Sequence, residues 1–107
     1  MTSLTRLRYA NENRQAEWDP ENVVTLGFRG LELGGEAGEA LNVVKKLERT
    51  RLGIIGPTDT IEHLAEELAD VIICADLVAM TAGINLATAV REKFNATSVK
   101  VGLKTRL

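Results

Sequence analysis

The sequence predicts an all-α domain built as an antiparallel bundle of three to four helices. Two observations support this fold class. Apolar residues recur at helical spacing along most of the chain, and no segment alternates between apolar and polar residues for long enough to indicate a strand. The chain has 107 residues, of which 45% are hydrophobic and 26% are charged, as is typical of one globular domain. We therefore expect residues 1–107 to form a single domain.

The first two helices are predicted to follow each other closely. A polar, helix-compatible segment with a thin apolar stripe extends from Leu4 to Trp18. Asp19-Pro20-Glu21 then indicates a new helix start, because an acidic N-cap precedes a proline at the first helical position. The apolar spacing continues this second helix to about Arg51.

The third helix is predicted over Ile61 to Ala82, after a start at Asp59 and Glu62 that resembles a capping box. Gly83 suits its C-terminal cap, and a fourth helix is expected from Asn85 to about Thr97. The third helix is apolar nearly all round, and a chain of this length has few other elements to cover it. We therefore expect an oligomer.

Glycines interrupt the second helical segment, although each costs about 1 kcal/mol relative to alanine in a helix interior. Two explanations stay open at this point. One is a kink or a close approach between helices, and the other is a backbone that lies near a ligand. Five of the nine glycines of the chain lie within the twelve residues 27–38 of this segment: Gly27, Gly30, Gly34, Gly35 and Gly38.

Charge and residue usage exclude several classes of protein. The net charge of −2 argues against a general nucleic-acid binder or a membrane-surface binder. No apolar run reaches the roughly 18–20 residues of a membrane span, and a polar stretch follows Arg6 and Arg8 where a signal peptide would be apolar. A lone Cys74 and a lone His63 exclude an internal disulfide and a zinc cluster. We expect a cytoplasmic protein without nucleic-acid or membrane partners.

The small net charge conceals an uneven distribution. Residues 52–90 hold six acidic side chains and no Lys or Arg, whereas residues 91–107 hold five basic side chains and one acidic one. An acidic middle without neutralising residues suggests that a cation comes from outside the chain.

Acidic residues also recur at helical spacing. Glu32, Glu36 and Glu39 share one face of the second predicted helix, where like charges repel unless a cation compensates them. Glu67 and Asp70 are three residues apart on the third helix, and Asp70 precedes an apolar run that favours an inward position. Hard divalent cations stabilise such converging carboxylates, so we expect Mg²⁺, or Mn²⁺, at Glu36, Glu39, Glu67 and Asp70.

Each acidic pair alone is far more typical of a solvated helix face than of a metal site. The two pairs together, in a segment without basic residues, make the metal site as good an interpretation as the solvated face. A ferritin-like di-iron bundle would use similar acids, but it needs a histidine three residues after a glutamate. His63 does not have that spacing, so we exclude this alternative.

The two acidic motifs resemble the ExxE…ExxD signature of the MazG-like all-α nucleotide pyrophosphohydrolases. The motifs are Glu36-Ala37-Gly38-Glu39 and Glu67-Leu68-Ala69-Asp70, and the similarity extends from about Arg14 to Arg106. The family also has a Lys and an Asn on its last helix. Many members space them four apart with an Arg following, whereas Lys93 and Asn95 are two apart here.

The resemblance implies a Mg²⁺-dependent enzyme that hydrolyses nucleoside triphosphates between the α and β phosphates, releasing a nucleoside monophosphate and pyrophosphate. It also implies a homodimer or homotetramer, with the site completed by a neighbour's residues. Two alternatives stay open. One keeps the fold and changes the substrate, for instance to dUTP or phosphoribosyl-ATP, and the other is a non-catalytic helical interaction module.

Several side chains are candidates for catalysis and phosphate binding. Glu36 is our first choice for the carboxylate that activates water, and Glu32 is the second. Lys93, Asn95 and Lys46 are candidates for contacts to phosphate.

Residues of the first predicted helix are candidates for binding the base. Asn11, Gln15 and Trp18 share one face there, where amides can bind base edges and the indole can stack. A core position for Trp18 with solvated amides is an equally good interpretation. Asp76 is expected to pair across a subunit interface or to face solvent.

Overall fold

The computed structural model describes all 107 residues and contains four helices and no strand. They are α1 (Ser3–Trp18), α2 (Leu26–Arg51), α3 (Ile61–Thr81) and α4 (Leu86–Lys100). The predicted all-α class is therefore confirmed. The bounds of α1 and α3 match the prediction to within a residue, and α4 continues three residues beyond the predicted end.

Each helix starts at a side chain that accepts a hydrogen bond from the third residue after it. These N-caps are Thr2, Thr25, Thr60 and Asn85. The prediction for Asn85 is confirmed, as is a turn at Gly83, which has the left-handed φ of 73° that favours glycine. The capping box predicted at Asp59 is wrong, because the cap is Thr60.

The predicted start of α2 at Asp19 is wrong, because the chain turns there. The Asp19 carboxylate accepts backbone N–H bonds from Val23 and Val24, each at 2.9 Å, and Asn22 has a φ of 53°. An aspartate at the head of a turn satisfies the same kind of donors as an N-cap, so the local sequence resembles a helix start. The helix begins seven residues later, at Leu26.

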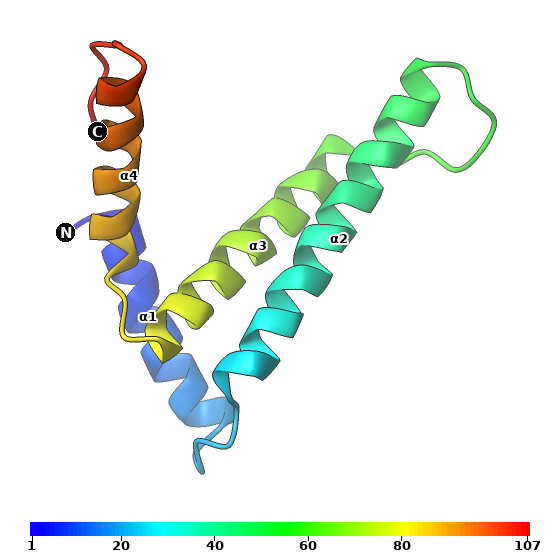
Figure 1. Cartoon of the computed structure of the whole chain (residues 1–107). Coiled ribbons are helices and arrows are strands. Elements are labelled where there is room, and N and C mark those ends of the chain that lie inside the picture. Colours follow the sequence, from blue (N-terminus) through cyan, green and yellow to red (C-terminus); the bar gives the residue numbers. More distant parts are fainter.

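Helices α2 and α3 form an antiparallel pair, and α1 crosses the C-terminal part of α3 (Figure 1). Helix α4 contacts α1 and α3 but not α2, so the molecule has the shape of an open V. The pair α2–α3 forms one arm, and α1 with α4 forms the other. The small apolar core consists of Ala40 and Val43 from α2 and Leu77 and Ala79 from α3.

One chain does not close a bundle by itself. Its radius of gyration is 17.0 Å, against about 13 Å for a compact domain of this length. Only 8 of 107 residues are buried, and large apolar side chains such as Leu31, Leu41 and Ile72 are exposed. A Cβ added at Gly30, Gly34, Gly35 or Gly38 would meet no atom within 4 Å, so close packing inside this chain does not explain these glycines.

A buried polar cluster joins α1 to α3. Asp76 has no exposed surface, and its carboxylate accepts bonds from Arg8 Nε and from Asn11 Nδ2, the latter at 2.9 Å. Arg8 Nη2 also lies 3.0 Å from the Asp76 carboxylate and donates to the carbonyl oxygen of Ile84. The expectation that Asp76 faces solvent or pairs across an interface is therefore wrong, because its partners are in the same chain.

None of the four helices, taken alone, has the length and apolar character needed to cross a membrane. Helices α3 and α4 satisfy that test only as a pair, and they are bent by 107° where they join.

Candidate metal centre

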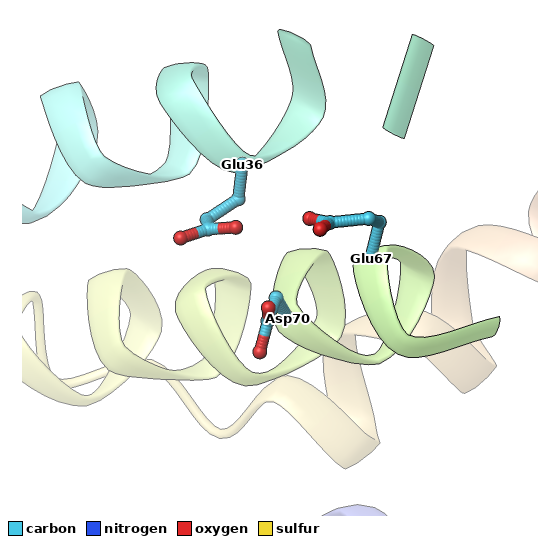
Figure 2. A group of neighbouring side chains, drawn as sticks. All are labelled: Glu36, Glu67 and Asp70. Carbon is cyan, nitrogen blue, oxygen red and sulfur yellow. The ribbon is translucent and has the colours of Figure 1, made fainter. Parts of the chain in front are cut away.

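Three carboxylates converge between α2 and α3. Glu36 comes from α2, and Glu67 and Asp70 come from α3, with one oxygen of each lying within 4.8 Å of the others. Figure 2 shows Glu36 and Glu67 extending toward one another across the space between the helices. The spacing of three residues brings Glu67 and Asp70 to neighbouring positions on α3, and antiparallel pairing places Glu36 opposite them.

The cluster has little to offset its negative charge, since His63 beside Glu67 is the one basic side chain that bonds to it. Glu36 and Glu67 are half-buried, and an oxygen of each, Oε2, is buried without a hydrogen-bond partner. Asp70 is exposed, so the inward position expected for it is wrong. No Lys or Arg forms a salt bridge with any of the three carboxylates. Orphaned carboxylate oxygens are costly, and a hard cation with oxygen ligands would satisfy them.

The electrostatics of Glu36 show how crowded the cluster is. Desolvation between the two helices is the main cause that raises the pKa of Glu36 above its usual value. Repulsion from Glu39, Asp70 and Glu67 raises it further. A bound cation would favour the ionised form and reverse this effect.

His63 connects Glu67 to the loop before α3. Its Nε2 lies 3.0 Å from Glu67 Oε1, and its Nδ1 lies 2.8 Å from Asp59 Oδ1. The hydrogen bond with Asp59 is the main cause that raises the pKa of His63. His63 therefore orients Glu67 toward α2, a role that its four-residue spacing from both acids could have indicated.

The other two acids of α2 lie outside this group of three. Glu39 is exposed and close enough to raise the pKa of Glu36, although none of its oxygens joins the three that converge. Glu32 is also exposed and lines a separate cavity toward α1. The structure thus brings together Glu36, Glu67 and Asp70, with Glu39 beside them and Glu32 apart.

The candidate base-binding residues of α1 occupy three different environments. Asn11 is buried, and its amide bonds to Asp76 and to the carbonyl oxygen of Ile73. Gln15 is half-buried, whereas Trp18 is 71% exposed. Gln15 and Trp18 line the same cavity as Glu32, so only these two residues of the predicted face adjoin it.

The candidate phosphate-binding residues do not reach the acids within one chain. Lys93 and Asn95 lie on α4, which does not contact α2. Asn95 exchanges hydrogen bonds with the backbone of Leu107, and Lys46 Nζ lies 3.9 Å from Asp59 Oδ2.

Sequence reasoning missed Arg29, which is buried between α1 and α2 and donates to Gln15. Arg29 lies three residues before Glu32, so the helical spacing that places Glu32 and Glu36 on one face of α2 also places Arg29 there.

No family model, no curated protein and no solved structure matches this chain.

Proposed function

We propose that this chain is a metal-dependent nucleoside triphosphate pyrophosphohydrolase of the MazG-like kind. The observation that carries the proposal is the convergence of Glu36, Glu67 and Asp70, whose oxygens lie within 4.8 Å of one another. Two buried carboxylate oxygens without partners make a cation the natural complement of this site. The proposed products are a nucleoside monophosphate and pyrophosphate.

The chain's acids would divide two tasks between them. Glu67 and Asp70, with Glu36 and Glu39 opposite, would hold Mg²⁺ or Mn²⁺, both of which prefer oxygen ligands. When bound, such a cation neutralises phosphate charge and lowers the pKa of water. Glu36 is the proposed carboxylate that orients the attacking water and accepts its proton, because it faces Glu67 and Asp70 across the space where the cation would lie.

The proposed phosphate contacts require a second copy of the chain. Lys93 and Asn95 form no hydrogen bond or salt bridge with the acids of their own chain, and α4 does not pack on α2. A homodimer or homotetramer that covers the exposed apolar residues of α2 could bring them to a neighbour's site. The open shape and the exposed Leu31 and Leu41 support this assembly.

The decisive experiment incubates the purified protein with Mg²⁺ and a panel of ribo- and deoxyribonucleoside triphosphates and measures pyrophosphate. The wild type is expected to release pyrophosphate, while Glu36→Gln and Asp70→Asn lose roughly 10²–10⁴-fold in rate. Glu66→Gln is the matched control, because Glu66 is an exposed acid of α3 outside the cluster.

Three other outcomes would redirect the proposal. Release of inorganic phosphate without pyrophosphate would change the reaction. Activity confined to dUTP or phosphoribosyl-ATP would keep the fold and the reaction but change the substrate. Pyrophosphate from no substrate at all would contradict the proposal and favour a helical interaction module.

A further inference from the structure

Arg29 is a buried cation that forms no salt bridge. Only 4% of the residue is exposed. Its Nη1 and Nη2 both donate to Gln15 Oε1 over long distances of 3.4 Å, and its Nε has no partner. A buried guanidinium bonded only to one neutral amide leaves donors for a further acceptor.

No carboxylate of the chain bonds to the guanidinium. Asp19 lines the same cavity, and backbone bonds from Val24 and Val23, together with the charge of Arg29, lower its pKa, but it forms no hydrogen bond or salt bridge with Arg29. Glu32 also lines the cavity and forms no salt bridge with Arg29. A ligand with acceptor atoms would complete this arrangement.

The cavity beside Arg29 suits a flat heteroaromatic ring. Its volume is about 200 Å³, and its lining includes the aromatic side chains of Trp18 and Phe28 together with the polar groups of Gln15, Arg29 and Glu32. The Arg14 guanidinium lies over the Trp18 ring, 4.9 Å from its centre, in a cation–π contact, so one side of the indole is in contact with a polar group of the chain. Aromatic walls with a few convergent polar groups are typical of sites for small aromatic ligands.

The position of the cavity relates it to the acids. Arg29, Glu32 and Glu36 share one face of α2, and Arg29 is two turns, about 10 Å, from Glu36. A ribose and its first phosphate could bridge that separation. The cavity can therefore hold a base while the phosphates lie at Glu36, Glu67 and Asp70.

We propose that Arg29 reads the base of the substrate and that this cavity selects guanine. This inference rests on the proposed function for the phosphates. Guanine presents two adjacent acceptors, O6 and N7, which match the two-pronged guanidinium, and its N1–H and N2–H groups match a carboxylate such as Glu32. Gln15 accepts from Arg29 through Oε1, which leaves its amide N–H groups to donate to O6.

The test compares dGTP with dATP, dCTP, dTTP and 7-deaza-dGTP, which lacks the N7 acceptor. The wild type is expected to prefer dGTP at least tenfold in kcat/KM and to lose roughly 5–150-fold with 7-deaza-dGTP, as for one bidentate arginine–guanine pair. Arg29→Met should bring the ratio between dGTP and 7-deaza-dGTP close to one. Arg6→Met, an exposed arginine of α1, should keep the wild-type ratio.

A binding measurement separates this inference from the proposed reaction. Trp18 is the single tryptophan, so its fluorescence can report dGMP and 7-deaza-dGMP binding in EDTA, without metal or hydrolysis. If dGMP binds at least fivefold tighter but no triphosphate is hydrolysed, the base site stands and the proposed function fails. If pyrophosphate is released but all bases react equally and both monophosphates bind alike, the proposed function stands and this inference is overturned. These comparisons on the wild type decide the matter even if Arg29→Met does not fold.

Discussion

Removing Arg8 should destabilise the protein strongly, because its partner Asp76 is fully buried in the intact structure. In Arg8→Leu the Asp76 carboxylate keeps the Asn11 amide, 2.9 Å away, but loses its contacts to Nε and Nη2 of the guanidinium. Breaking a buried ion pair from one side costs about 3–5 kcal/mol. Since 20% of the Arg8 side chain is exposed and water can enter where it leaves, we expect a loss of about 3 kcal/mol.

A double-mutant cycle tests the interaction between Arg8 and Asp76. Asp76→Leu is expected to lose about 2–3 kcal/mol, because Arg8 keeps its bond to the Ile84 carbonyl and its access to solvent. The double variant replaces both charges by apolar groups, a change that is often nearly neutral for buried ion pairs. It should therefore lose at least about 2 kcal/mol less than the sum of the single variants.

Urea unfolding at one fixed protein concentration measures all four proteins, because self-association would otherwise add to the apparent stability. Arg6→Leu serves as the control, since Arg6 is exposed on the same helix and forms no salt bridge. If the stability loss of the double variant equals the sum of the two single losses to within about 0.5 kcal/mol, Arg8 and Asp76 do not interact and the prediction is refuted.

Three further predictions concern pH, helix propensity and assembly. Backbone bonds, first from Val24, lower the pKa of Asp19, so its stabilising contribution is present above about pH 4 and is lost as the pH falls. The stability gap between wild type and Asp19→Asn should thus narrow in acid; a constant gap would contradict this. Gly30→Ala should raise the free energy of unfolding by about 0.5–1 kcal/mol, because its Cβ meets open space; a loss would show that another chain packs there. Leu31→Glu with Leu41→Glu should convert an oligomer into a monomer in sedimentation equilibrium, and an unchanged mass would place the interface elsewhere.

The helices could be predicted where local signals agree. For α4, an Asn cap precedes apolar residues at helical spacing, and the end of α3 is marked by a glycine with positive φ. The start of α2 could not be predicted in this way, because an aspartate before a proline can cap a helix or head a turn. Only the bonds from Val23 and Val24 to Asp19 distinguish the two.

The candidate site was predictable in part for a similar reason. The spacing within one helix indicates that Glu67 and Asp70 are neighbours, and their meeting with Glu36 follows once α2 and α3 are antiparallel. Burial of Asp76 depends on Arg8, which lies 68 residues away in the sequence, so no local pattern could reveal it. The same holds for Asn11, whose amide is bound to Asp76 rather than free for a ligand.

Mn²⁺ binding, measured by electron paramagnetic resonance, is the most direct test of the metal site. Ions that bind to the protein no longer contribute to the signal of free Mn²⁺, so the fall of this signal measures binding. We expect the wild type and Glu66→Gln to bind Mn²⁺ with equal affinity. Glu36→Gln and Asp70→Asn should bind it at least tenfold more weakly, because each removes a charged oxygen from the cluster. Equal Mn²⁺ binding by all four proteins, or none by the wild type, would contradict the central claim that these carboxylates form a metal site.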